Sequence, residues 1–265
     1  MIIVKELESI GELIDFPFLG GQKETVFPRR MNYTFRGQNR ESYDLRSSLK
    51  RNSGSRTGYA EIRLLNNFRK YGELLEPQIC KSIWNTMIVA QHHGVPTRCL
   101  DFSLSPLVAL HFALTENVEY ENACVWAINH GILHRELLPK EYIDMLNRRN
   151  AVSFTVEMFE DMGLTIEKYN KDMKDSCVVF LEPPSIDSRI VNQFSHLAIL
   201  PDTLDPFDSF LENLTIEQVV YKFIIPKDKI SLFRNQLDKM NITERVLFPG
   251  LDGLASYLKR RYSYE

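Results

Sequence analysis

Residues 91–106, QHHGVPTRCLDFSLSP, hold more groups able to do chemistry than any other stretch of the chain. His92 and His93 carry the side chain best suited to proton transfer near neutral pH. Gly94 and Pro96 indicate a helix end followed by a rigid turn. Because loops held between rigid elements commonly carry function, we expect this stretch to form one wall of a functional site.

Three further side chains of this stretch are candidate functional residues. Arg98 and Asp101 stand three residues apart, so they could pair with each other and fix the turn. Ser103 could hydrogen-bond a ligand, or it could serve only to cap the next helix. That helix is predicted to begin at Ser105-Pro106, with Ser as the N-cap and Pro in the first helical position.

A second constellation is Arg36-Gly37-Gln38, at the end of a β-prone segment. A guanidinium there could clamp a phosphate or a carboxylate with two hydrogen bonds, and the glycine would let a ligand approach the backbone. The structural alternative is an arginine buried in a salt bridge. Downstream, Arg189 and Gln193 share one face of a predicted helix, where they could reach a ligand or cap the sheet edge.

The candidate catalytic carboxylate is Glu244, on a predicted strand just before Phe248-Pro249-Gly250. Asp252 is expected to cap the last helix. His130 and His134 have the four-residue spacing of a metal-binding pair, but no third ligand follows in the sequence. We therefore expect a surface pair of histidines and no metal.

Composition narrows the class of protein. The 265 residues are 44% hydrophobic and 25% charged with a net charge of -3, as in a globular domain. No apolar run approaches the length of a membrane span, and the first residues lack a signal-peptide cleavage pattern. Four cysteines without a CxxC pair fit reduced thiols. We expect one domain over 1–265, in the cytoplasm, without membrane contact.

One region is strongly basic. Residues 29–63 contain nine Arg or Lys and three acidic residues. This balance favours an anionic ligand such as a phosphate, a nucleotide or a nucleic acid. The alternative is a solvated face whose arginines pair with distant acids.

Hydrophobic periodicity and turn residues predict the following elements. Helices are expected within 1–16 and at 57–72, 79–93, 106–115, 131–148, 188–194, 227–240 and 251–262. Strands are expected at the start of 1–16 and at 31–36, 123–128, 178–184, 196–200, 217–226 and 242–250, with loops at 17–30 and 201–215. Residues 150–176 give no clear signal. Helices crowd the first half and strands the second, which predicts an α+β domain.

Six blocks of this sequence resemble the FRG family. They are FRGQ (35–38), LRSSLKR (45–51), QHHGVPTRCLDFSLSPLVALHFA (91–113), RIVNQFS (189–195), FIIP (223–226) and LFPGLDGLA (247–255). The resemblance extends over about 31–260 and implies a single FRG-type domain. Members of that family occur largely in bacteria and their phages, often in a defence or toxin-like context.

A more distant similarity is to mono-ADP-ribosyltransferases, which use an early-strand Arg, a Ser-Thr-Ser strand before a helix, and a late catalytic Glu. Arg36 takes the place of that Arg. Residues 101–103, Asp-Phe-Ser, fall on Ser-Thr-Ser, so the last Ser alone matches. Glu244 lies one residue away from the late Glu. This similarity implies an ADP-ribosyltransferase-like mixed or antiparallel β core flanked by helices, with NAD as ligand.

These observations predict an NAD-dependent ADP-ribosyltransferase-like effector, a toxin or an anti-phage factor, that acts on a protein or nucleic-acid acceptor. The expected catalytic residues are Arg36, His93, Ser103 and Glu244. The expected nucleotide contacts are Arg36, Gly37, Gln38, Gln91, His92, Arg98, Asp101, Arg189 and Gln193. Two alternatives stay open: a non-catalytic module that binds a nucleotide or nucleic acid, and a nuclease with His92 and His93 as acid and base.

Overall fold

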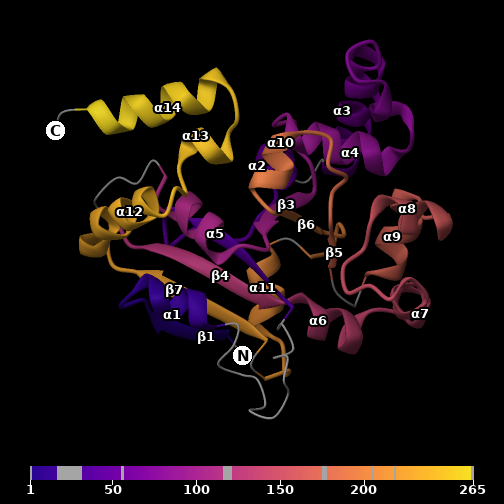
Figure 1. Cartoon of the computed structure of the whole chain (residues 1–265). Helices are drawn as coiled ribbons and strands as arrows, with labels where there is room; N and C mark the ends of the chain where they lie inside the picture. Colours follow the sequence, from indigo (N-terminus) through magenta and orange to yellow (C-terminus); the bar gives the residue numbers. More distant parts are fainter. Residues whose placement is uncertain are drawn as a thin grey trace.

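The fold is built on one seven-stranded mixed sheet (Figure 1). The computed structural model describes residues 2–16, 32–54, 57–115, 121–174, 178–204, 206–217 and 219–263. The strand order is β1-β7-β4-β2-β3-β6-β5, in which β1 and β7 are parallel and every other neighbouring pair is antiparallel. The strands are β1 (Ile2–Glu6), β2 (Tyr33–Gln38), β3 (Cys99–Ser103), β4 (Ala123–Asn129), β5 (Val179–Leu181), β6 (Ser195–Ile199) and β7 (Val220–Ile225). A mixed sheet with many helices agrees with the predicted single α+β domain.

The α-helices that surround the sheet are short, with α3 the longest of those described. They are α1 (Ile10–Asp15), α2 (Ser48–Ser53), α3 (Thr57–Gly72), α4 (Ile83–His92), α5 (Pro106–Ala113), α6 (His130–Leu137), α7 (Lys140–Arg149), α8 (Val156–Asp161), α9 (Ile166–Asp172), α10 (Ser188–Asn192), α11 (Phe207–Glu212), α12 (Ile230–Lys239), α13 (Glu244–Leu247) and α14 (Leu251–Tyr262). Short 3-10 turns occupy Pro77–Cys80 and Lys227–Lys229.

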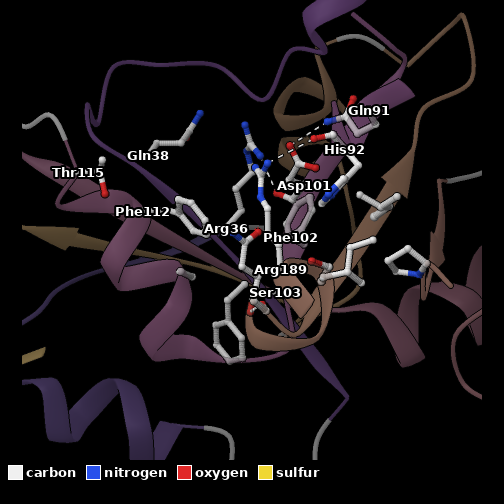
Figure 2. Close-up of a pocket in the computed structure, with 18 of the residues that line it drawn as sticks. Arg36, Gln38, Gln91, His92, Asp101, Phe102, Ser103, Phe112, Thr115 and Arg189 are labelled. Carbon is white, nitrogen blue, oxygen red and sulfur yellow. Dashed lines mark hydrogen bonds between the residues drawn. The ribbon is translucent and has the colours of Figure 1, made fainter. Parts of the chain in front are cut away.

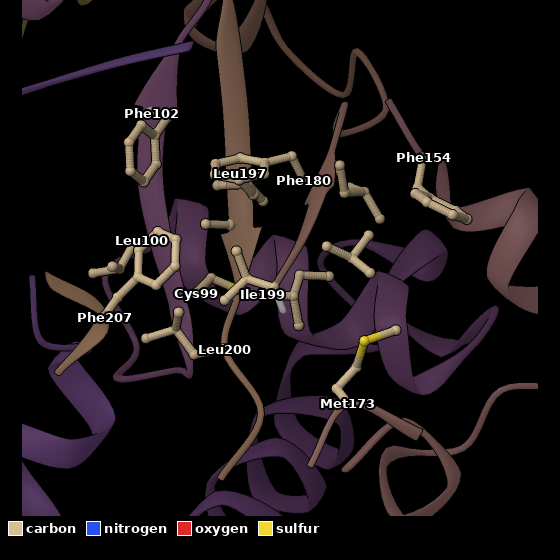
Figure 3. Close-up of a cluster of buried hydrophobic side chains, with 14 of the residues drawn as sticks. Cys99, Leu100, Phe102, Phe154, Met173, Phe180, Leu197, Ile199, Leu200 and Phe207 are labelled. Carbon is tan, nitrogen blue, oxygen red and sulfur yellow. The ribbon is translucent and has the colours of Figure 1, made fainter. Parts of the chain in front are cut away.

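The central strand β4 is buried at every position. Its side chains alternate between two apolar clusters, because successive residues of a strand face opposite sides of the sheet. Ala123, Val125 and Ala127 pack in the cluster that α1, α5 and α12 also supply. Trp126 packs in the larger cluster on the other face, which continues through β3, β6 and β5 (Figure 3).

The sheet nearly separates between β2 and β3. The two strands are in register at one pair of residues, Phe35 and Ser103, and then diverge. On one side, β2 is held against α5 by Gly37: a Cβ there would lie 1.9 Å from the carbonyl oxygen of Ala109. The glycine is therefore required by helix packing. It also lines the pocket described below, so the predicted approach of a ligand to its backbone stays a prediction.

Several local predictions are confirmed. Ser105 caps α5 with its hydroxyl accepting from the Val108 amide, and Pro106 is the first helical residue. Gly94 follows the end of α4 with a φ of +79°, the left-handed conformation expected of a glycine there. The predicted loop at 17–30, together with Arg29, Arg30 and Arg56 of the basic region, lies outside the described residues.

The structure corrects other predictions. Residues 242–250 contain the short helix α13 and no strand, so Glu244 lies at a helix start. The residue that caps α14 is Gly250, and Asp252 lies inside the helix. The predicted loop 201–215 contains α11. Residues 150–176, for which the sequence predicted no element, contain α8 and α9.

His130 and His134 are buried in α6, not at the surface as predicted. His134 donates from Nδ1 to the Val152 carbonyl oxygen at 2.8 Å and accepts from the Phe180 amide at Nε2 at 2.9 Å. Each of its ring nitrogens therefore has a structural partner. In the described part of the chain no group of three or more His, Cys, Asp or Glu is placed to hold a metal.

Candidate functional site

A pocket of about 790 Å³ opens where β2 and β3 diverge (Figure 2). Its lining comes from β2, β3, α4, α5 and α10, together with the loop and helix α2 that follow β2. The pocket lies beyond the one register pair that the two strands share, and α5 packs closely against β2 at Gly37 beside it. Residues far apart in sequence thereby face one cavity.

Arg36 bridges the gap between the two strands. Its Nη1 donates a 2.6 Å hydrogen bond to the Asp101 carbonyl oxygen, and its buried Nε has no described partner. Burial lowers the pKa of Arg36, with the charge of Asp101 opposing that shift and the charge of Arg51 adding to it. An arginine in this setting is stabilised by an additional negative charge.

Two more arginines line the same pocket. Figure 2 shows Arg189 rising from α10 into the cavity that also holds Arg36. Arg189 Nη1 lies 3.4 Å from the His92 carbonyl oxygen, and its guanidinium stacks over the Phe248 ring at 5.0 Å. Its Nε is buried without a described partner. Arg51, from α2, donates to the Arg46 carbonyl oxygen and is exposed.

The described residues supply no carboxylate ion pair to Arg36, Arg51 or Arg189. Two acids also line the pocket: the Asp101 carboxylate accepts from the Gln91 side chain at 2.8 Å, and Asp44 pairs with Arg46 at 3.2 Å. The three positive charges therefore outnumber the negative charges that face the same cavity. Such an arrangement can bind an anion, since guanidinium groups match phosphate and carboxylate geometry.

A second cavity of about 500 Å³ adjoins the first. Gln91, His92, Asp101 and Arg189 line both cavities, whereas the exposed His93 lines the smaller one alone. His92 Nε2 lies 2.6 Å from a carboxylate oxygen of Asp187. Asp187 itself was missed by the sequence analysis, although an Asp directly before a predicted helix is a capping signal.

Ser103, Gln193 and Gln38 line the pocket with side chains already hydrogen-bonded inside the protein. Ser103 Oγ donates to the Gln193 carbonyl oxygen at 2.7 Å, and the Gln193 amide donates to Leu247 at 3.0 Å. The Gln38 side-chain amide donates to the Asp44 backbone carbonyl oxygen at 3.0 Å, and the Gln38 side-chain oxygen accepts from the Trp126 indole at 2.7 Å. These bonds hold the wall of the cavity in place.

Two predicted site residues lie elsewhere. Arg98 is buried and pairs with Glu61, with Asp202 at 3.0 Å, and not with Asp101. Glu244 is outside the lining of the pocket, where it is bound by Arg234 and Arg260. Burial opposes the charge of Glu244, but the Arg260 hydrogen bond and other contacts outweigh it and lower the pKa of that carboxyl to about 2.

Aromatic rings complete the pocket. Phe102, from β3, and Phe112, from α5, both line it (Figure 2). Phe112 also meets Phe248 edge-on at 6.0 Å. The sequence predicted the helix that carries Phe112 but did not single out this ring as a pocket residue. A flat apolar face beside arginines suits a ligand that joins a ring to an anionic group.

Comparison with known proteins finds one match. Residues 31–122 match the sequence model of the FRG domain, which supports the resemblance to the FRG family. No curated protein and no solved structure matches the chain. The matched segment carries β2, β3, α4 and α5, and thus Arg36, Arg51, His92 and Asp101, while Arg189 lies beyond it. No helix among the described residues has the length and apolar character of a membrane span.

Proposed function

We propose that the pocket binds a nucleotide through its phosphates, with NAD as the ligand, and that the protein transfers ADP-ribose from NAD to a macromolecule as a toxin or defence effector. One observation carries the proposal: Arg36, Arg51 and Arg189 face one cavity, and two of these guanidinium groups have a buried Nε without a described partner. A diphosphate would supply the missing acceptors and charge.

The ADP-ribosyltransferase-like core is part of this proposal. An arginine on an early strand, a serine on the adjacent strand and a helix directly after that serine support it, and here these are Arg36, Ser103 and α5. In the described lining, Asp101 and Asp44 are the carboxylates that face the cavity, and Glu244 is not among them. We therefore propose Asp101, and not Glu244, as the carboxylate beside the reacting ribose.

The test is calorimetric titration of the full chain with NAD. Arg51→Gln is the first variant, because the side chain is exposed and its loss leaves the core intact; Arg36→Gln and Arg189→Gln follow. Each should weaken binding about tenfold or more, as expected for a lost charge-assisted hydrogen bond. Arg149→Gln, an exposed arginine of α7 outside the pocket lining, is the matched control. No binding at millimolar NAD, or equal losses in all four variants, contradicts the proposal.

The pairing of His92 with Asp187 favours a second candidate, a nuclease. His92 and His93 both line the smaller cavity with ring centroids 5.2 Å apart, and an imidazole pair can supply the acid and the base for phosphodiester cleavage. Incubation with RNA or DNA tests this function directly. Cleavage that needs no NAD and is lost in His92→Gln and in His93→Gln would support the nuclease over the transferase.

A further inference from the structure

His92 stands where the two cavities meet. It lines the pocket of about 790 Å³, which holds the arginines, and also the adjoining cavity of about 500 Å³. Ser48 and His93 line the smaller cavity alone, and both can hydrogen-bond a second molecule. A reaction between two bound partners requires such a junction, with a proton-transfer group beside it.

One contact holds the His92 imidazole and another holds its backbone. Its Nε2 meets Asp187 at 2.6 Å, and its own carbonyl oxygen is 3.4 Å from Arg189 Nη1. The other carboxylate oxygen of Asp187 accepts from the Ile190 amide at 3.0 Å, so the carboxylate is itself held. When Nε2 carries the proton that it donates to Asp187, Nδ1 carries the lone pair and can accept a proton.

We propose that His92 is the general base that activates a hydroxyl-bearing acceptor in the smaller cavity, with Asp187 as its positioning residue. This inference rests on the proposed binding of NAD in the larger pocket. The acceptor oxygen forms a bond to the anomeric carbon of the NAD ribose. The bond from that carbon to nicotinamide breaks, its electron pair leaves with nicotinamide, and the acceptor proton passes to His92.

The charges around the junction favour a hydroxyl over other nucleophiles. A carboxylate acceptor is already deprotonated, so it needs no general base. A guanidinium acceptor would meet Arg189 in the smaller cavity and Arg36 and Arg51 in the adjoining pocket, and these three charges outnumber that of Asp101, which lines both. A neutral hydroxyl, whether of water, a serine or a ribose, meets no repulsion and needs its proton removed.

The charged and titratable groups near His92 set the pH dependence. Asp187 and Arg189 come from the α10 segment, His93 from the end of α4, and Asp101 from β3. Asp187 remains ionised, because hydrogen bonds from the Ile190 amide and His92 outweigh its burial and lower its pKa. Because a general base acts only in its unprotonated form, the rate of transfer should rise with pH.

The experiment follows nicotinamide release from NAD in water and in added methanol, the two smallest hydroxyl acceptors, with agmatine as a guanidinium acceptor. The full chain should form ADP-ribose and its methyl glycoside and leave agmatine unmodified. His92→Gln should reduce the rate about 100-fold and abolish the rise with pH, while the variant still binds NAD. Asp187→Asn, which can still cap α10, should reduce the rate less.

Three results would overturn the assignment while leaving NAD binding intact. One is a His92→Gln variant with the rate and pH profile of the unaltered chain. Another is loss of the pH dependence in His93→Gln instead. The third is a protein that binds NAD but releases no nicotinamide in either solvent. Transfer to agmatine in preference to water and methanol would overturn the assignment as well. Absence of NAD binding itself would show instead that the proposed function fails.

Discussion

The Arg36 side chain donates a 2.6 Å hydrogen bond to the backbone carbonyl of Asp101, across the gap where their two strands have separated. One residue thus joins the sheet and faces the pocket. A ligand that binds Arg36 would also act on the β2–β3 junction, because the same guanidinium holds both. Stability and ligand binding are therefore expected to be linked at this position.

This linkage gives the first prediction. Arg36→Met keeps much of the apolar stem but removes the bond to Asp101, so the free energy of unfolding should fall by about 1–2 kcal/mol. In the unaltered chain, saturating NAD should raise the urea midpoint, and in Arg36→Met it should not. Urea unfolding followed by circular dichroism, with and without NAD, measures both effects. An NAD-induced shift retained in the variant would contradict the link.

Gly37 provides a prediction about packing. A Cβ at this position would lie 1.9 Å from the Ala109 carbonyl oxygen and 2.6 Å from the Ala113 nitrogen, both of them backbone atoms. Gly37→Ala should thus destabilise the protein by about 3 kcal/mol or more, since α5 must move away from β2. Gly58→Ala is the matched control, because nothing lies within 4 Å of its added Cβ and alanine favours the helix. Similar melting temperatures for the two variants would show that α5 does not pack as closely against β2 at Gly37.

The buried histidines predict loss of stability in mild acid. Burial lowers the pKa of His111 and of His134 to about 4 and that of His196 to about 3, and burial and two neighbouring histidines lower the pKa of His130 well below its usual value. An unfolded histidine titrates near 6.5. Below that pH the unfolded chain binds protons that the folded chain does not, so the folded state loses about 1.4 kcal/mol per pH unit for each histidine.

Urea unfolding at pH 7, 6 and 5 measures this dependence. The free energy of unfolding should be nearly constant above pH 7 and fall steeply between 6.5 and 5. His196→Gln should reduce the slope by about one quarter, because it removes one of the four titrating groups. Equal stability at pH 7 and pH 5 would mean that these histidines are protonated inside the fold.

A variant of Glu244 tests whether this carboxylate has a structural or a catalytic role. Arg260 binds both Glu244, at 2.7 Å, and Asp238, at 2.7 Å, so the carboxyl links α12, α13 and α14. Glu244→Gln should lower the free energy of unfolding by about 3 kcal/mol, as expected when one partner of a buried ion pair is removed. Binding of NAD should be unchanged. A folded Glu244→Gln protein that binds NAD but has lost transfer would return Glu244 to the reaction.

Local signals in the sequence predicted much of the fold. The Ser105-Pro106 start of α5, the left-handed Gly94 and the apolar run of β7 each depend on neighbours within a few residues. For the same reason the stretch 91–106 could be recognised as one wall of a site. Arg36, His92 and Asp101, chosen from the sequence, do line one pocket in the structure.

Pairings over long distances could not be predicted in this way. Arg98 finds Glu61, which lies 37 positions earlier, although Asp101 is three residues away. Glu244 lies in a β-prone segment, yet its two arginine partners come from α12 and α14 and fix it in a helix. The spacing of His130 and His134 places them on one face of a helix but does not say whether that face is buried.

The position of β7 between β1 and β4 has a consequence for the making of the protein. β1 leaves the ribosome long before the strand it pairs with, which begins only at Val220. Until that segment emerges, β1 has no partner in the described sheet and one edge of β4 stays open. The sheet therefore closes only after residue 220 has been made, and a chain interrupted before it would present unpaired strand edges to its neighbours.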